Sequence, residues 1–205
     1  IVDQDNDGTV DITAGSLLLR AGQAIGVAAN PLQTAVGTLA ARAGSGGIFL
    51  ADADALAVGA VSVSVQQIAT DGSSVEATDS LQGVATVAGD DAIVLRAAGD
   101  LQLLAGDGAQ PVVSVHSAGH LRLESVAGAV LVAGGVAPSG GSASLLAAGD
   151  IVFEAGGSLR AGGAGTLDIA SGSGAVQMAA GSQLVADGGA IRVAGEQVRV
   201  AGITT

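Results

Sequence analysis

Short stretches in which apolar and polar residues alternate recur along the chain. The clearest copies are 98–103 (Ala-Gly-Asp-Leu-Gln-Leu), 118–123 (Ala-Gly-His-Leu-Arg-Leu) and 148–153 (Ala-Gly-Asp-Ile-Val-Phe). In each copy two large apolar residues stand on either side of a single residue, and alternate side chains of a strand point to the same face. The repeated unit is therefore predicted to be a turn followed by a short strand with one buried face.

Strands of this kind are predicted about every seven to ten residues along much of the chain. Their central residues are mostly polar, as at Gln102, Arg122 and Asp168, which indicates that the second face of each strand meets solvent. The predicted strands are 10–12, 17–19, 48–50, 61–65, 93–95, 101–103, 113–115, 121–123, 130–132, 151–153, 167–169, 176–178, 191–193 and 198–200.

One segment, 23–43, is the nearest candidate for a helix. Leu32, Val36 and Leu39 follow one another at helical spacing, but Pro31 and the surrounding glycines limit the segment to a short turn of helix. We therefore expect an all-β chain.

Many short, half-buried strands fit two classes of fold, an antiparallel sandwich or barrel and a parallel β-solenoid. A sandwich typically has strands of about five or six residues and an aromatic residue in its core. The strands predicted here are shorter, and Phe49 and Phe153 are the only aromatic residues in the sequence. A solenoid instead stacks coils of about twenty residues with three short strands each, so that inward Leu, Ile and Val residues lie on one another.

The spacing of the repeated unit favours the solenoid. Gly99 and Gly119 are twenty residues apart, the expected length of one coil, whereas the next copy, at Gly149, follows after thirty residues. A loop inserted at 134–142 would account for the longer step. We therefore predict a single module over 1–205, a parallel β-helix (β-solenoid) of roughly ten coils, and a segment of a longer repeat protein.

Composition and charge limit the kinds of partner that the chain is expected to bind. Of the 205 residues, 34 are glycine and none is cysteine, so the chain can turn often but cannot form disulfides. Nineteen acidic residues against seven arginines give a net charge of −12. Because phosphate groups are bound by clustered positive charge, nucleic acid and anionic membrane surfaces are not expected as partners, whereas divalent cations are. Glycine and proline interrupt every long apolar run, so no membrane insertion is predicted.

The sharpest chemical motif is an acidic run near the N-terminus, Asp-Gln-Asp-Asn-Asp-Gly-Thr-Val-Asp. Asp3, Asp5, Asp7 and Asp11 stand at positions 1, 3, 5 and 9 of an EF-hand-type loop with glycine at position 6, a spacing that brings carboxylate oxygens together around calcium. The twelfth position, which normally supplies a bidentate carboxylate, is Ala14. We give equal weight to a weak calcium site formed by the four aspartates and to a solvated acidic turn.

Other polar groupings are interpreted as structural. His116 and His120 have the spacing of a helical metal pair, but they flank a glycine between predicted strands and are expected at the surface. Asp100, His120 and Asp150 share one position of the repeat and could line one face, as in solenoid hydrolases and lyases, but repeated turn polarity is the favoured interpretation. The glycine-rich run 162–165 lacks the residues of a calcium nonapeptide or a phosphate loop and is predicted to be a turn.

Units close to Gly-x-Leu-x-Leu-x-Ala, at 99–105 and 149–155, resemble the repeats of filamentous-haemagglutinin-like exoproteins and of very large bacterial surface adhesins. The segments 30–39 (Asn-Pro-Leu-Gln-Thr-Ala-Val-Gly-Thr-Leu) and 46–56 (Gly-Gly-Ile-Phe-Leu-Ala-Asp-Ala-Asp-Ala-Leu) are similar to such proteins as well. The resemblance implies a right-handed parallel β-helix that serves as the shaft of an exported fibre at the cell surface. It carries over no catalytic residue.

Two classes of function remain. The first is a structural or adhesive module, a rigid spacer or part of an extracellular fibre. The second is a β-helix hydrolase or lyase acting on polysaccharide, but such enzymes usually present aromatic or clustered basic residues to sugars, and the arginines here are scattered. An ice-binding surface would need regular threonine arrays, which the sequence lacks. We predict a secreted or cell-surface module without enzymatic activity, whose partners are neighbouring repeats or copies of itself end to end, with a cell-surface or matrix molecule as a candidate ligand.

Overall fold

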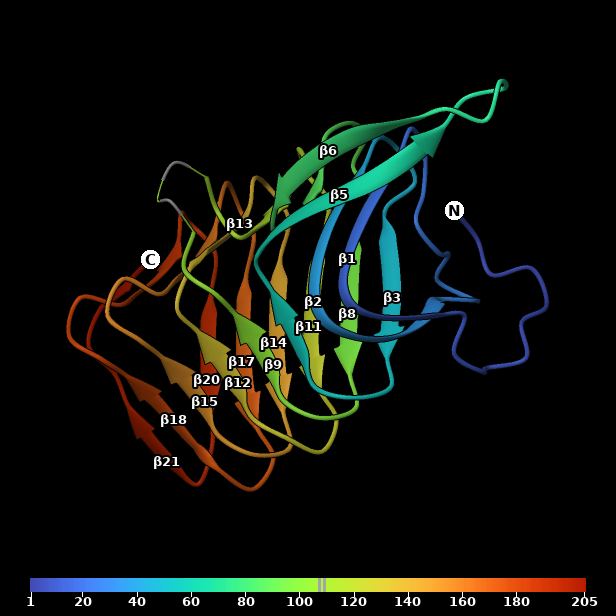
Figure 1. The fold of residues 1–205 in the computed structure, drawn as a ribbon. Helices are drawn as coiled ribbons and strands as arrows, with labels where there is room; N and C mark the ends of the chain where they lie inside the picture. Colours follow the sequence, from blue (N-terminus) through green and yellow to red (C-terminus); the bar gives the residue numbers. More distant parts are fainter. Residues whose placement is uncertain (107, 109) are drawn as a thin grey trace.

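The computed structural model describes residues 1–106, 108 and 110–205, and every regular element in this part of the chain is a strand. The strands form a parallel β-helix, as Figure 1 shows. Six coils carry three strands each, and each strand pairs in parallel with its counterparts in the neighbouring coils. The predicted fold class is therefore confirmed.

Counterpart strands form three stacks along the axis of the helix, here called the first, second and third stack. The first stack consists of β3 (Ile48–Asp52), β8 (Ile93–Ala97), β11 (Leu121–Ser125), β14 (Ala143–Ala147), β17 (Leu167–Ser171) and β20 (Ile191–Ala194). The second stack consists of β4 (Leu56–Val58), β9 (Leu101–Leu103), β12 (Val130–Val132), β15 (Ile151–Phe153), β18 (Ala175–Met178) and β21 (Gln197–Arg199). The third stack consists of β7 (Val84–Thr86), β10 (Val113–Val115), β13 (Gly135–Pro138), β16 (Ser158–Ala161), β19 (Gln183–Ala186) and β22 (Ile203–Thr204).

Two longer strands, β1 (Ile12–Ala21) and β2 (Leu32–Ala43), form the N-terminal levels. β2 follows all three stacks, because successive parts of it pair with β3, β4 and β7, and β1 pairs with β2. The segment 23–43, for which the sequence allowed at most a short turn of helix, therefore contributes a strand and no helix. Leu32 and Val36 are an even number of residues apart, so they share a strand face as readily as a helix face, and both are buried.

The coils are longer than the sequence repeat suggested. Leu121 of β11 pairs with Ala143 of β14, 22 residues later, and Ala143 pairs with Leu167 after a further 24. The copy of the repeat at Gly99 leads into the second stack and the copy at Gly119 into the first, so the distance between them is not one coil. With β1 and β2, the described residues form eight levels, where roughly ten were predicted.

The insertion in the helix is a hairpin, β5 (Ala60–Ile68) and β6 (Ser74–Gln82), which lies between β4 and β7. The hairpin contacts β1 and β2: Val61 is buried, and Arg20 of β1 forms an ion pair with Asp79 of β6 at 2.8 Å. The loop predicted at 134–142 was wrong, because β13 occupies this segment as a regular part of its coil.

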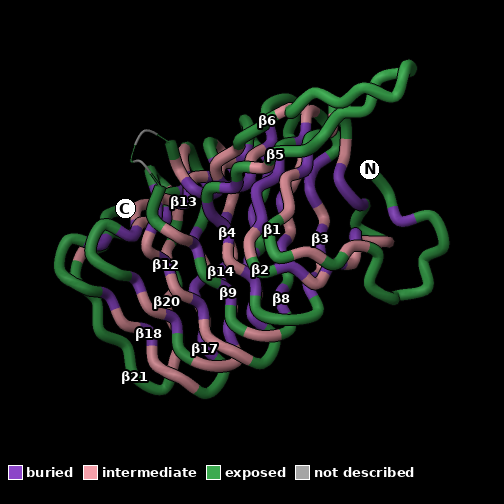
Figure 2. The backbone as a smooth tube through the Cα atoms, viewed as in Figure 1, coloured by how far each residue is buried: buried purple, intermediate pink, exposed green. Residues whose placement is uncertain are grey.

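The hairpin begins and ends at one point of the coil. The chain leaves the coil at Gly59 and returns at Gly83, whose N–H donates a hydrogen bond to the carbonyl of Gly59 at 2.8 Å. Gly83 has a φ of +66°, and a Cβ at this position would collide with the carbonyl of Val112, so only glycine fits. The tip of the hairpin extends away from the coils (Figures 1 and 2), and Val65 and Val75 are exposed there.

The core runs along the axis of the helix, and its buried residues lie on the inner side of the strands (Figure 2). Within the second stack, inward side chains of successive coils lie in line, as at Leu103, Val132, Phe153 and Met178. The predicted orientation is confirmed: the inward positions Leu101, Leu103, Leu121, Leu123, Ile151 and Phe153 are buried, and Gln102 and Arg122 are exposed.

Candidate cation site in the N-terminal loop

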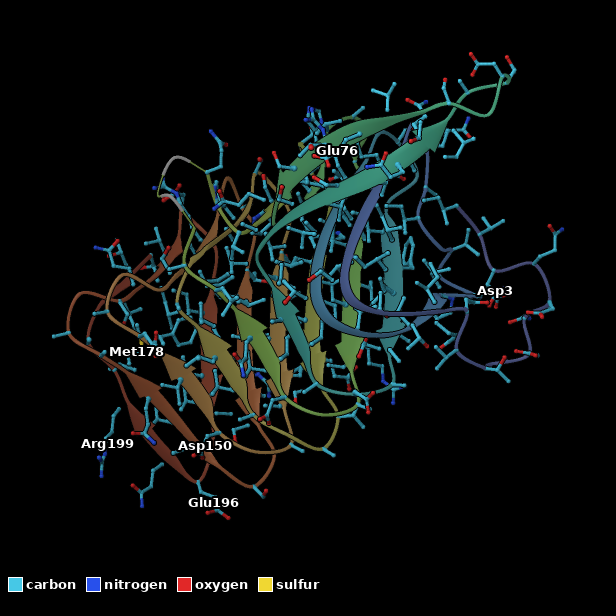
Figure 3. All side chains as sticks on the ribbon, in the orientation of Figure 1. Asp3, Glu76, Asp150, Met178, Glu196 and Arg199 are labelled. Atoms are coloured by element: carbon cyan, nitrogen blue, oxygen red, sulfur yellow. The ribbon has the colours of Figure 1, made fainter. Side chains whose placement is uncertain are left out.

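An acidic loop, residues 1–11, precedes β1 and lies beside the N-terminal levels (Figures 1 and 3). Three of its carboxylates converge: Asp3, Asp5 and Asp11 each place an oxygen within 4.8 Å of the other two. These residues are called the Asp cluster below. Within the residues that the structure describes, they are the one group of three or more side chains of metal-binding type that approach so closely.

Asp3 is the buried member of the Asp cluster, with 9% of its surface exposed. Its Oδ1 accepts hydrogen bonds from the backbone N–H groups of Asp5 (3.0 Å) and Asn6 (3.1 Å). Its Oδ2 is shielded from solvent and has no hydrogen-bond partner among the described residues while the neighbouring carboxylates are ionised. Few buried polar atoms in proteins lack a partner, because leaving a hydrogen bond unmade in the interior costs free energy.

The loop is attached to β2 at two points. Asp11 Oδ2 accepts a hydrogen bond from the backbone N–H of Gln33 at 2.9 Å, and the N–H of Asp11 donates to the carbonyl of Gln33 at 3.0 Å. The side-chain amide of Asn30, just before β2, donates to the carbonyl of Asp3 at 3.1 Å. The motif in the sequence gave no sign of Asn30 and Gln33, because they reach the loop through the stacking of one level on the next.

Asp7 is not a member of the Asp cluster, although its spacing predicted a ligand. Its Oδ1 accepts hydrogen bonds from the backbone N–H and the hydroxyl of Thr9, at 2.8 and 2.7 Å. The carboxylate therefore stabilises a turn of the loop. Three of the four predicted aspartates come together, and the fourth points to a different partner.

The carboxylates of the loop influence one another. The pKa of Asp5 is raised, mainly because a protonated Asp5 can donate a hydrogen bond to the carboxylate of Asp3, and further by the negative charge of Asp7. The N–H of Asn6 is the main cause that lowers the pKa of Asp3, and the hydroxyl of Thr9 is the main cause that lowers the pKa of Asp7. A proton on Asp5 is therefore favoured beside the ionised carboxylate of Asp3.

Asp100, His120 and Asp150 do not form one acidic line. Asp100 and Asp150 lie at the corner before the second stack, two coils apart, whereas His120 lies at the corner before the first stack. Each side chain accepts a hydrogen bond from the backbone of the following coil, which fits the interpretation as repeated turn polarity. The donors are the N–H groups of Ala129, Ala175 and Ser142, which lie 2.8, 2.7 and 3.1 Å from Asp100 Oδ1, Asp150 Oδ1 and His120 Nδ1.

The two histidines and the glycine-rich run occupy the places predicted for them. His116 and His120 are both exposed, and His116 Nδ1 lies 2.9 Å from the carbonyl of Gly89. Residues 162–165 form a turn after β16, with Gly163 at a φ of +58°.

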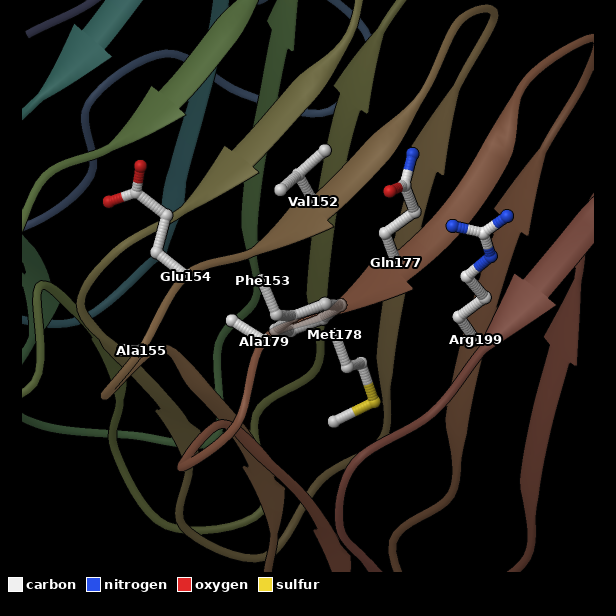
Figure 4. A pocket seen from close by; sticks show the side chains of 8 residues that line it. All are labelled: Val152, Phe153, Glu154, Ala155, Gln177, Met178, Ala179 and Arg199. Carbon is white, nitrogen blue, oxygen red and sulfur yellow. The ribbon is translucent and has the colours of Figure 1, made fainter.

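An open groove crosses the outer face of the second stack near its C-terminal end (Figure 4). Val152, Gln177 and Arg199 lie next to one another on β15, β18 and β21. Glu154 follows β15 and, in the described part of the chain, forms no ion pair with Arg199. Glu154 is the one carboxylate among the residues that line the groove, so the groove does not bring two carboxylates together.

Comparisons with known proteins give no relative. No family model matches the chain, and neither a curated protein nor a solved structure matches it. Among the described residues there is no helix of the length and hydropathy needed to cross a membrane. The function must therefore be argued from the fold and from the polar sites.

Proposed function

We propose that the chain is a structural or adhesive segment of an extracellular fibre or of a large surface adhesin, in which the coils form a rigid shaft. The supporting observation is uninterrupted stacking: three strand stacks continue through six coils around one apolar core. Each coil of a solenoid contacts its neighbours, so coils can be added without changing the existing contacts. At about 4.8 Å per level, eight levels extend on the order of 35 Å.

The alternative, a β-helix enzyme that degrades polysaccharide, has less support. Glycoside hydrolysis typically requires two carboxyl groups on either side of the scissile bond. Asp100 and Asp150 each accept a backbone hydrogen bond from the next coil, and the Asp cluster lies in a loop beside the coils. These positions fit a structural role better than a catalytic one.

Both ends of the shaft are strand edges that favour end-to-end association. In the described residues β1 pairs with β2 alone, and β20, β21 and β22 have neighbours on one side. Val198 and Ile203 are 43% and 44% exposed, although their counterparts in the previous coil, Val176 and Leu184, are fully buried. Because open edges pair with further strands, neighbouring repeats or copies of the chain are the proposed partners.

Light scattering over a range of protein concentrations tests the shaft proposal. We expect the apparent mass to rise with concentration, and electron microscopy to show rods. A variant with Val198→Lys and Ile203→Lys should remain monomeric, because charges then stand where the apolar core would continue. Arg199→Lys, on the outer face of the same strand, is the matched control and should associate like the wild type.

Two results would contradict the proposal. A wild-type protein that remains monomeric at high concentration has protected ends and does not extend by stacking. Release of reducing sugar ends from acidic or neutral polysaccharides would instead favour the β-helix enzyme.

A further inference from the structure

We propose that Asp3, Asp5 and Asp11 bind one divalent cation of calcium's size, which fastens the N-terminal loop to β2. This inference goes beyond the shaft function and does not depend on it. Calcium holds its oxygen ligands at about 2.3–2.6 Å, so two ligands of one ion lie at most about 5 Å apart. Three equally spaced oxygens on one calcium ion lie at most about 4.5 Å apart. The oxygens of the Asp cluster lie within 4.8 Å of one another, so a shift of a few tenths of an ångström at most brings all three carboxylates onto a single ion.

The burial of Asp3 is a second observation that points to a ligand. Asp3 is more than nine-tenths buried, and its Oδ1 already accepts two backbone hydrogen bonds. Its Oδ2 is buried and has no hydrogen-bond partner in the described part of the chain, although it belongs to a carboxylate that lies against two others. A cation in the Asp cluster gives this oxygen a partner and offsets the repulsion among the three negative charges.

The Asp cluster brings the beginning of the N-terminal loop, at Asp3 and Asp5, next to its end, at Asp11. Asp3 and Asp5 lie in the first half of the loop, and the carbonyl of Asp3 accepts a hydrogen bond from Asn30. Asp11 lies directly before β1 and is held by Gln33 of β2 through its Oδ2. An ion bound to all three carboxylates therefore closes the loop on itself and against β2.

The type of ligand selects the type of cation. The Asp cluster offers carboxylate oxygens and contains neither histidine nor cysteine, which favours a hard cation over zinc or copper. Asp5 and Asp11 are exposed, so water can complete the coordination. Magnesium needs near-ideal octahedral geometry, whereas calcium accepts an irregular set of six to eight oxygens.

The role of Asp7 separates this proposal from a regular EF-hand loop. In an EF-hand arrangement Asp7 would be the third ligand, but here its carboxylate is hydrogen-bonded to Thr9. Asp3 and Asp7 carry the same charge in the same loop, so substituting each by asparagine changes the net charge equally. Only the change at Asp3 is expected to remove a ligand.

Calorimetry with calcium on chelator-treated protein tests the proposal. We expect saturable uptake of one ion per chain, with a dissociation constant on the order of 10⁻⁴–10⁻³ M, and a higher melting temperature with calcium. Asp3→Asn and Asp5→Asn should each lower the affinity about tenfold or more, because the number of charged ligands falls. Asp7→Asn, and Asp71→Asn in the turn of the hairpin, should bind as the wild type does.

The Asp3→Asn variant keeps an oxygen that can accept the hydrogen bonds of Asp5 and Asn6, so its loop should fold, and circular dichroism checks the coils. Absence of saturable uptake by the wild type would overturn the proposal. Equal loss of affinity in Asp7→Asn and Asp3→Asn would overturn it in favour of an EF-hand arrangement. The proposal would also be overturned if magnesium bound as calcium does and the Asp3→Asn variant bound as much as the wild type. Such binding would be non-specific screening of the chain's net negative charge.

Discussion

At the scale of single residues, the polar side chains at the corners of the coils share one task. Asp100, Asp150 and His120 each accept an N–H of the following coil, and Ser142 Oγ accepts the N–H of Thr166 at 3.0 Å. Corner N–H groups lie outside the strand ladders and need another partner when they are shielded from water. The requirement is for an acceptor, which explains why aspartate, serine and histidine replace one another without common chemistry.

The alternation of buried and exposed residues can be tested within β9. Leu103 is fully buried, whereas the neighbouring Gln102 is exposed. Leu103→Asp is expected to prevent folding, because burying an unpaired charge costs more than the total stability of a small domain, about 5–15 kcal/mol. Gln102→Asp should fold and melt within a few degrees of the wild type by circular dichroism. If the Leu103→Asp variant has the same melting temperature as the wild type, the register of β9 is wrong.

At the scale of elements, the β5–β6 hairpin is attached to β1 by a charge pair that acid removes. Arg20 donates two hydrogen bonds to Asp79, at 2.8 and 2.9 Å, and these hold the pKa of that carboxyl below its usual value. A carboxyl whose pKa is lowered by folding stabilises the fold above its unfolded pKa and loses this contribution as the pH falls through the folded pKa. Hydrogen-exchange protection of β5 and β6, relative to β8, should therefore decrease below about pH 4.

The variant Asp79→Asn isolates this carboxyl from the other acidic groups. It should show at neutral pH the weaker hairpin protection that the wild type shows in acid, with little further loss on acidification. The effect should be modest, because both side chains are about half exposed and solvent screens the pair. Equal acid dependence in the variant and the wild type would show that other carboxylates control the hairpin.

Most strands with two large inward residues could be predicted from the sequence, as β9, β11 and β15 were, whereas β4, with Leu56 and Val58, was missed. β14 was missed because Ala143 and Ala147 stand on either side of Leu145, so its two faces differ little in hydropathy. The coil length was wrong for a different reason. The repeated Ala-Gly-Asp unit marks a corner, a coil has three corners, and copies at two different corners are not one coil apart.

The Asp cluster was partly predictable because its members are close in sequence. Asp3, Asp5 and Asp11 follow from the spacing of the motif, whereas the orientation of Asp7 depends on its hydrogen bonds to Thr9. The contact with Gln33 depends on the pairing of β1 with β2, and β2 was not among the predicted strands because the spacing of its apolar residues fits a helix as well as a strand.

At the scale of the whole molecule, the coils are expected to be interchangeable units. Residues 143–166 make up one coil, because Ala143 pairs with Leu167 in the next. Deleting them would place Leu167 on Leu121 inside the helix and Asp168 beside Arg122 outside it. The shortened chain should unfold cooperatively and keep a β-type circular dichroism spectrum, because solenoid stability is approximately a sum over coils and their interfaces.

Deletion of residues 143–153 is the matched control. It removes the strands β14 and β15 but leaves β16, so the remaining strands no longer meet counterparts of their own stack. This variant should fail to fold. If the two deletions are equally destabilising, the coils depend on particular neighbours, such as the large side chain of Phe153, and are not interchangeable.

The hydrogen bond between Gly83 and Gly59 closes the coil beneath the hairpin, so the path of the coil is complete without residues 60–82. Sequence can therefore lengthen, shorten or be replaced between these two glycines while the stacks above and below keep their register. The hairpin that projects at this point is thus structurally separable from the stacked coils, which determine the length of the molecule. During evolution the segment between Gly59 and Gly83 can therefore be replaced by one that binds a different molecule, while the core of the β-helix stays the same.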